Sequence, residues 1–208
     1  MKRIFVVGDS ISVHYGDYLS RMLSENFICV PREGMEEALQ NINAAVGGNG
    51  GDSRRVLEFL TAQQQNGEMI YDILLFNCGL HDIKRNPPEG LLQVPIDEYK
   101  ENLEKILSLL KKENVFPVFI NTTPVNDEIH HSYLVQNFGI ERFSSDVLDY
   151  NKAAEKIMKD NNIDVIDLFS FTAELGEKAY CDHVHYNEDV REKQAIFIAE
   201  TLMSLLKD

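Results

Sequence analysis

Short runs of consecutive apolar residues, rich in β-branched side chains, recur along the chain at residues 4–7, 73–76, 116–120 and 165–168, with a weaker run at 27–30. Consecutive apolar positions are typical of strands that are buried on both faces, whereas strands with one wet face alternate apolar and polar residues. We therefore expect these runs to be the buried strands of one sheet.

Stretches with helical periodicity separate these runs. Apolar residues recur there at the spacing of one helix face, so we expect helices over residues 15–24, 53–64, 97–112, 146–161 and 189–206. Strands that alternate with helices pair in parallel through right-handed crossovers. The pattern predicts an α/β fold: a three-layer α/β/α sandwich of the flavodoxin-like type with about five parallel strands.

The remaining stretches, at residues 31–51 and 124–144, show neither pattern, and we expect irregular loops there. Asp52 and Asp97 stand at the starts of two helical stretches. Both are candidate N-caps, because a short polar side chain accepts hydrogen bonds from the free N–H groups of a first turn.

The composition fits one globular domain over residues 1–208, with 44% apolar and 26% charged residues. Such a mixture buries a core and lacks the polar bias of disordered segments. The formal net charge of −14 creates a field that repels polyanions. Neither nucleic acid nor an anionic membrane surface is therefore an expected partner, and a small molecule is easier to accept.

The three cysteines, Cys29, Cys78 and Cys181, are odd in number and widely spaced, so they cannot complete a disulfide framework. This favours a reducing compartment. The apolar run at residues 4–7 is too short for a secretory signal, and no segment approaches the ~18 apolar residues of a membrane helix. We expect a cytoplasmic protein.

The tripeptide Gly8-Asp9-Ser10 directly follows the first strand. In an open parallel sheet, active-site groups collect on loops beyond the carboxyl ends of the strands. Glycine permits a tight turn there, and a serine at its end is presented to a substrate. Asp and Ser are also ordinary turn and cap residues, so the tripeptide alone is a weak signal for a nucleophile.

A second motif, Asp182-x-x-His185, precedes the last helical stretch. Its spacing lets Asp182 reach one imidazole nitrogen of His185 within a single turn, which leaves the other nitrogen free to take a proton. A serine hydroxyl needs such a base at neutral pH, and the base needs a carboxylate that fixes its tautomer. Ser10, His185 and Asp182 supply these three roles. The alternative is a capping aspartate beside a half-buried histidine.

Two further turns contain glycine, Gly79-Leu80-His81-Asp82 and Gly50-Gly51-Asp52-Ser53. Acyl transfer needs hydrogen-bond donors aimed at the developing oxyanion, and a glycine N–H near a helix start or a histidine ring N–H is a donor of this kind. The alternative is that both are tight turns with a capping aspartate.

Taken in order, these motifs resemble the SGNH hydrolases, also called the GDSL esterases and lipases. Gly8-Asp9-Ser10 resembles the first block of that family, with Ser10 as nucleophile. Asp182-x-x-His185 resembles its fifth block, which supplies the base and its orienting acid.

Other parts of the chain extend the resemblance from Ile4 to the last helical stretch. Gly51-Asp52-Ser53 resembles the second block, with Gly51 as an oxyanion-hole amide, and Thr123-Pro124-Val125 resembles a proline-containing stretch often found after the fourth strand. The resemblance implies a carboxylic ester hydrolase that forms an acyl-enzyme on Ser10 and needs neither cofactor nor metal.

One position departs from the family pattern. The third block is usually Gly-x-Asn-Asp, whose Asn amide donates to the oxyanion, and His81 stands at the place of that Asn. A neutral imidazole has one N–H and can donate it in the right tautomer. We therefore predict an oxyanion hole formed by the N–H groups of Ser10 and Gly51 together with His81.

A metal site is the weaker interpretation of the histidines. Metal-ligand residue types cluster at Cys181, Asp182, His183 and His185, and His130-His131 would add others. A zinc site needs several rigidly held ligands, and no second cluster has convincing spacing. His183 is then a loop residue or a wall of the pocket.

Two shorter features, a glycine-rich run and a basic pair, lie near these motifs. The glycine-rich run at residues 47–51 lacks the Gly-Lys-Ser/Thr sequence of a phosphate loop and follows no clear strand, so we exclude a nucleotide site. Lys84 and Arg85 follow the His81 turn as solvated charge or as contacts for an acidic group on a substrate.

The resemblance, together with the absence of an obvious apolar lid, favours small acyl esters, notably O-acetyl groups on sugars, over long-chain lipids. Two other functions stay open. One is a binding protein of the same fold that has lost turnover through the change to His81. The other is an acyltransferase that uses the same acyl-enzyme. The sequence does not predict the oligomeric state.

Overall fold

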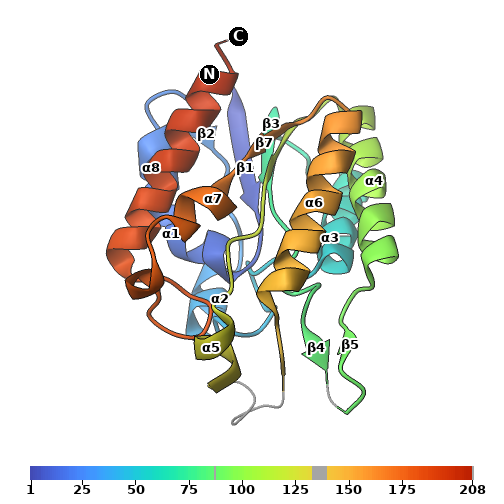
Figure 1. The fold of residues 1–208 in the computed structure, drawn as a ribbon. Helices are drawn as coiled ribbons and strands as arrows, with labels where there is room; N and C mark the ends of the chain where they lie inside the picture. Colours follow the sequence, from blue (N-terminus) through green and yellow to red (C-terminus); the bar gives the residue numbers. More distant parts are fainter. Residues whose placement is uncertain (87, 133–139, 208) are drawn as a thin grey trace.

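The central sheet has five parallel strands in the order β2-β1-β3-β6-β7 in the computed structural model, which describes residues 1–86, 88–132 and 140–207 (Figure 1). The strands are β1 (Arg3–Val7), β2 (Ile28–Cys29), β3 (Ile73–Phe76), β6 (Phe116–Ile120) and β7 (Asp164–Ile166). Val7 pairs with Phe76, and Phe76 with Phe119. The carboxyl ends of the three central strands therefore meet at one edge.

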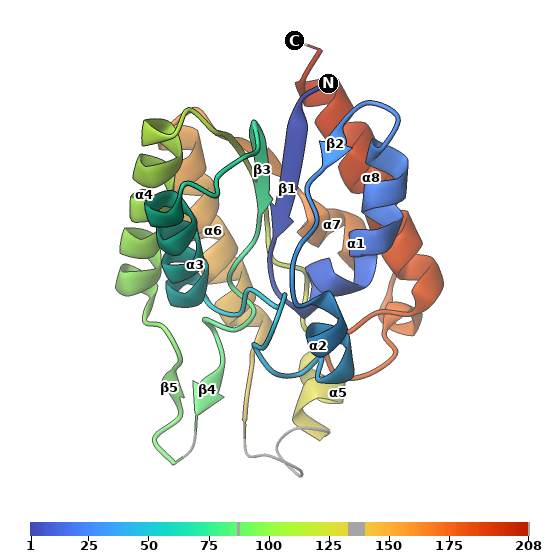
Figure 2. The ribbon, with the colours of Figure 1, turned by 180° about the vertical axis from the view of Figure 1, so that it is seen from behind.

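Helices cover both faces of this sheet (Figures 1 and 2). One layer contains α1 (Ser10–Leu23), α7 (Leu168–Ala173) and α8 (Glu188–Leu205). The other contains α3 (Ser53–Asn66), α4 (Ile96–Lys112) and α6 (Ser144–Asp160). The three-layer α/β/α architecture is confirmed.

The core lies between the sheet and both helical layers. All four residues of β3 are fully buried, as expected for a strand at the centre of a sheet with helices on both faces. On α4, the apolar stripe of Leu103, Ile106 and Leu110 is fully buried as well. The spacing of these residues puts them on one helix face, and burying that face fixes the orientation of α4.

Small elements gather at the carboxyl ends of the strands, at the lower end of the molecule in Figure 1. They are α2 (Met35–Gln40), α5 (Asp127–His130) and the antiparallel pair β4 (Arg85–Asn86) and β5 (Leu91–Leu92). The loops expected at 31–51 and 124–144 thus contain α2 and α5, while residues 133–139 lie outside the described part. The short 3-10 helix η2 (Glu177–Ala179) precedes the loop that leads to α8.

Several element boundaries differ from the sequence-based expectation, and the differences at the starts of α1 and α4 have a clear cause. Helix α1 begins at Ser10 instead of residue 15, because the Asp9 carboxylate accepts the N–H of Ile11 at 2.9 Å and caps the helix. Helix α4 has Pro95 at its N-cap, so Asp97 is not the cap and lies in the first turn. A negative charge is favourable there too.

The last strand is shorter than the apolar run at residues 165–168. It ends at Ile166, because Asp167 accepts the N–H of Ser170 at 3.0 Å and starts α7 at Leu168. The prediction of a strand over residues 165–168 is therefore wrong for residues 167 and 168.

The three cysteines are free thiols, and Cys78 is fully buried behind β3. Among the described helices, none combines the length and the apolar character that crossing a membrane requires.

Candidate active site

The candidate site lies where the strand order reverses. Strand β1 is flanked by β2 on one side and by β3 on the other, so the loops that follow β1 and β3 diverge and leave a crevice at their carboxyl ends. Asn77 joins these ends, since its N–H donates to Val7 O at 3.0 Å and its side-chain amide donates to Ile120 O at 2.8 Å. The Gly8-Asp9-Ser10 turn and the His81 turn leave the sheet at this place.

Ser10 is the first residue of α1 and is 2% exposed. A side chain at Gly8 would come within 2.9 Å of the Ser12 hydroxyl, so this turn has no room for a larger residue. In the described part of the chain, the Ser10 N–H has no hydrogen-bond partner, as is usual for the first N–H groups of a helix. Its hydroxyl and its N–H are therefore both available for chemistry.

His185 lies between Ser10 and Asp182. Its Nδ1 is 2.7 Å from the Asp182 carboxylate, and its Nε2 is 2.8 Å from the Ser10 Oγ. The imidazole is 1% exposed. In the tautomer with the proton on Nδ1, the ring donates to Asp182 and its Nε2 accepts from the serine hydroxyl, which is the arrangement that a general base needs.

The loop itself fixes the Asp182 carboxylate. It accepts the N–H groups of Val184 at 2.9 Å and His185 at 2.8 Å, as well as the imidazole. Burial would raise the pKa of Asp182, but the hydrogen bond and charge of His185 and these two N–H groups outweigh it and hold the pKa well below its usual range. Asp182 is therefore ionised throughout the neutral range.

Ser10, His81 and His185 line one cavity of about 310 Å³. Burial, followed by the charge of Arg142, lowers the pKa of His81 to about 3, so its imidazole is neutral at pH 7 and has a single N–H to donate. His183 lines the same cavity, and its Nε2 is 3.3 Å from the Asn43 Oδ1. It thus forms part of the pocket wall.

Gly51 is placed differently from His81. Its φ of 66° requires glycine, and its N–H donates to the Asn49 Oδ1 at 3.0 Å. Among the described residues that line the cavity, Gly51 is absent. Its role as an oxyanion donor stays a prediction that requires this N–H to be shared with or released by Asn49.

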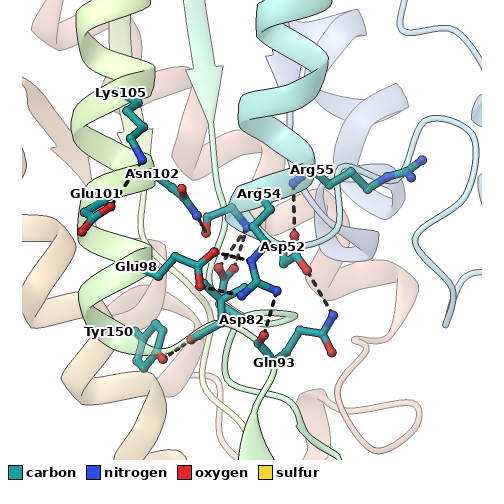
Figure 3. A network of polar contacts seen from close by, with 12 residues as sticks. Asp52, Arg54, Arg55, Asp82, Gln93, Glu98, Glu101, Asn102, Lys105 and Tyr150 are labelled. Carbon is teal, nitrogen blue, oxygen red and sulfur yellow. Dashed lines mark hydrogen bonds and ion pairs between the residues drawn. The ribbon is translucent and has the colours of Figure 1, made fainter.

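A buried polar network holds the His81 turn against the start of α3 (Figure 3). The Asp82 carboxylate is 0% exposed and accepts the N–H of Ser53 at 3.0 Å, while Asn102 of α4 donates to the Ser53 Oγ at 3.0 Å. Burial raises the pKa of Asp82 to about 7. The carboxylate of Asp82 therefore ties the His81 turn to the backbone of the Gly51-Asp52-Ser53 turn.

Further contacts in Figure 3 extend this network. Asp52 caps α3 by accepting the N–H of Arg55 at 3.1 Å, as the sequence predicted. Val94 N donates to Asp82 O at 3.0 Å, and the Tyr150 hydroxyl donates to Val94 O at 2.5 Å. The His81 turn is thereby connected to α6.

The proline-containing stretch after β6 contacts the loop that carries His185. The carbonyl of Pro124 accepts hydrogen bonds from the hydroxyls of Tyr180 at 3.1 Å and Tyr186 at 2.8 Å. Tyr186 directly follows His185 in the sequence, whereas Asp182 precedes it. These bonds therefore hold the backbone just after the base, and Asp182 holds the base from the residues before it.

Sequence reasoning missed two residues of the site. His14, one turn after Ser10, packs edge-on against the His185 ring with centroids 5.0 Å apart, and burial lowers its pKa to about 3. Arg142 lines the cavity, although no motif surrounds it. Of the basic pair noted in the sequence, Lys84 lines the cavity, whereas Arg85 forms an ion pair with Asp146 at 2.8 Å.

The metal interpretation depends on how the described histidines and acidic residues are arranged in space. Within residues 1–86, 88–132 and 140–207, no group of three or more His, Cys, Asp or Glu side chains is arranged to hold a metal ion. His130 is buried and packs on His183 with ring centroids 5.3 Å apart.

A comparison of the sequence with protein-family models identifies the family of this chain. The model of the GDSL-like lipases and acylhydrolases matches residues 4–198. A comparison with curated proteins yields no significant match.

Several solved structures share the fold at low sequence identity. A GDSL-like lipase from Bacteroides thetaiotaomicron has a TM-score of 0.66 at 14% identity, covering 97% of this chain and 87% of its own. An acetyl xylan esterase has a TM-score of 0.68 at 15% identity, covering 96% and 98%. A psychrotrophic esterase from Pseudoalteromonas sp. has a TM-score of 0.68 at 14% identity, covering 100% of both chains.

Proposed function

Because the chain belongs to the family of GDSL-like lipases and acylhydrolases, and so is a carboxylic ester hydrolase, we propose that it cleaves small acyl esters through an acyl-enzyme on Ser10. The observation that carries this proposal is the continuous hydrogen-bond chain from the Ser10 Oγ through His185 to Asp182. A serine hydroxyl becomes a competent nucleophile when a base fixed in this way removes its proton.

In the first half of the reaction, the Ser10 Oγ attacks the ester carbonyl carbon while the His185 Nε2 takes the hydroxyl proton. Asp182 stabilises the imidazolium that forms and keeps Nδ1 protonated. The imidazolium then donates its proton to the leaving alcohol, and the acyl group remains on Ser10.

In the second half, water attacks the acyl-enzyme, with His185 again as base and then as acid. The products are the carboxylic acid and free Ser10. The negative charge on the carbonyl oxygen is stabilised in both halves by the Ser10 N–H and the His81 imidazole. Gly51 joins these donors only by sharing or exchanging its hydrogen bond to Asn49.

The size of the cavity supports small acyl groups. At about 310 Å³, it lies at the lower end of ligand pockets, which span roughly 300–1,000 Å³. O-acetyl groups on sugars are the preferred substrates in this proposal, in a cytoplasmic setting and without a cofactor.

A panel of 4-nitrophenyl esters of increasing acyl length, followed by acetylated sugars, tests the proposal. We expect release that is fastest with acetyl and is lost in Ser10→Ala, and we expect a fluorophosphonate to modify Ser10 alone by mass spectrometry. Release that persists in a folded Ser10→Ala variant would exclude the acyl-enzyme. Added alcohols that divert the acyl group from water would instead indicate an acyltransferase.

A further inference from the structure

The cavity beside Ser10 has a charge opposite to that of the whole chain. Arg142 and Lys84 line it, and no Asp or Glu is found among its described lining residues. The chain as a whole carries −14. A cationic recess with low-dielectric walls in an acidic protein concentrates the field on whatever enters it.

The imidazoles of the cavity add no charge near neutral pH. Burial is the main cause that lowers the pKa of His81 to about 3 and that of His183 to about 4. The positive charge of the recess therefore comes from Arg142 and Lys84.

Arg142 is a buried cation that forms no ion pair with a carboxylate of the described residues. It is 7% exposed, and its Nε donates to the carbonyl of Leu80, next to His81, at 2.7 Å. Across the described chain, no hydrogen bond or ion pair engages its two terminal nitrogens. The nearby Asp9 carboxylate acts on it only through its field and is occupied in capping α1.

Two other arginines of this region have carboxylate partners, whereas Arg32, which does not line this cavity, has only neutral hydrogen-bond partners among the described residues. Arg85 holds both oxygens of Asp146, and Arg54 holds both oxygens of Glu98. Burial lowers the pKa of Arg142 to about 10, which still leaves the guanidinium charged at neutral pH. A buried charge without a partner is costly, and a carboxylate on a ligand in this cavity would supply the missing counter-charge.

Lys84 provides a second, weaker positive charge. It is partly exposed and, like Arg142, has no ion-pair partner in the described part of the chain. Its backbone N–H donates to the carbonyl of His81 at 3.3 Å, so Lys84 lies in the same turn as the proposed oxyanion donor, three residues after it.

We propose that the ester substrate carries a carboxylate close to the scissile bond, and that the terminal nitrogens of Arg142 bind this carboxylate while Lys84 adds to the attraction. The planar guanidinium matches the two oxygens of a carboxylate, which a lysine ammonium does not. The inference rests on the proposed esterase function and specifies its substrate class. On an acetyl ester the carboxylate belongs to the alcohol, and a dicarboxylic acyl group that carries it is the alternative that the experiment distinguishes.

Two matched pairs of esters distinguish a carboxylate on the acyl group from a carboxylate on the alcohol. Mono-4-nitrophenyl succinate and its methyl-capped diester place the charge on the acyl side. Acetoxybenzoate and its methyl ester place it on the alcohol side. The readout is the ratio of kcat/KM for the charged ester to kcat/KM for its neutral partner. We expect this ratio to exceed about tenfold in one pair, since loss of one well-placed ion pair is worth that much or more.

Variants of the two cations then assign the preference. Arg142→Met is expected to reduce the ratio by about tenfold or more, Lys84→Met by about threefold, and Arg142→Lys to an intermediate extent. Arg21→Met removes the same charge from an exposed site on α1 and serves as the matched control with an unchanged ratio. A ratio that stays at the wild-type value in folded Arg142→Met would overturn the inference.

Binding without turnover keeps this inference separate from the proposed function. Calorimetry on Ser10→Ala with the same ester pairs should show tighter binding of the charged member, and this preference should vanish when Arg142→Met is added. Binding preference without hydrolysis by the wild-type protein would overturn the esterase function and leave the anion site standing. Hydrolysis by the wild-type protein without a binding preference for the charged ester would overturn the anion site and leave the esterase function standing.

Discussion

In the proton-transfer half of the candidate site, His185 contacts both Ser10 and Asp182 directly, whereas in the oxyanion half His81 and Gly51 are positioned by other residues. The first half consists of two hydrogen bonds of 2.7 and 2.8 Å between the side chains themselves. In the second half, Asp82 and Asn49 make the contacts that fix the two turns.

The two halves therefore differ in what they require of the rest of the fold. Asp182 orients His185 within one four-residue loop, so this geometry is local. The bond from Ser53 to Asp82 joins residues 29 apart in sequence, and the bond from His185 to Ser10 joins residues 175 apart, so both of these depend on the packed fold. Damage to the first half should act mainly on the chemistry, apart from the pH-dependent stability that the Asp182 charge contributes, while damage to the second should change both chemistry and stability.

The largest effect on activity is expected from Asp182→Asn. An amide donates to the Nδ1 of His185 and favours the wrong tautomer, so kcat should fall on the order of 10⁴-fold. Asp189→Asn makes the same chemical change on the exposed face of α8 and is the control. Kinetics with 4-nitrophenyl acetate measure both, and a loss below about tenfold in Asp182→Asn would show that Asp182 does not orient the base.

Removal of the proposed oxyanion donor comes next in size. His81→Ala should lower kcat/KM by roughly 10²-fold, because one donor to the developing charge is lost. His81→Asn restores an N–H donor and should recover most of the rate. His183→Ala removes an imidazole from the same cavity and should cost much less. Equal losses in His81→Ala and His183→Ala would assign His81 to packing.

Asp82 and Asp182 should give opposite dependences of stability on pH. Burial raises the pKa of Asp82 to about 7, above the value of 3.8 in the unfolded chain. Its contribution to the free energy of unfolding is therefore full below pH 3.8 and is lost as the pH rises toward 7. Asp182, whose pKa is lowered, contributes above pH 3.8 and loses this contribution as the pH falls.

Urea denaturation of wild type, Asp82→Asn and Asp182→Asn between pH 3.5 and 7.5 would separate these contributions. The stability of Asp82→Asn relative to wild type should improve as the pH rises, by about 1.4 kcal/mol for each unit of pKa shift that is removed. A difference that does not vary with pH would show that Asp82 titrates normally in the folded protein.

The sequence predicted the elements whose signals are local and missed those that depend on packing. Four consecutive buried residues in β3 and the stripe on α4 carry their own pattern, and the Asp182-x-x-His185 spacing contains its own geometry. The start of α1 was missed because polar residues at the first turn hide the helical pattern, and only the Asp9 cap reveals it.

No pattern in the sequence indicated that Arg142 belongs to the site. It follows a stretch without periodicity, and its meaning comes from the cavity that it shares with Ser10 and His185. Such a residue is recognised only when segments far apart in the sequence are placed together. The hydrogen bond between Asn49 and Gly51 was missed for another reason, because it is local but depends on the positive φ of Gly51, which the sequence pattern does not reveal.

The smallest effect is expected at the outer edge of the oxyanion half, where Arg54 pairs with Glu98 (Figure 3). Their side chains are 42% and 38% exposed, so solvent screens the pair, and Arg54→Met should cost less than about 1 kcal/mol in the free energy of unfolding. Esterase kcat/KM should stay within about twofold of wild type, because Asp82 and Asn102 still hold Ser53. Urea denaturation and kinetics on the same preparation test this. A loss of activity as large as that in His81→Ala would mean that the surface pair, and not the buried carboxylate, positions the His81 turn.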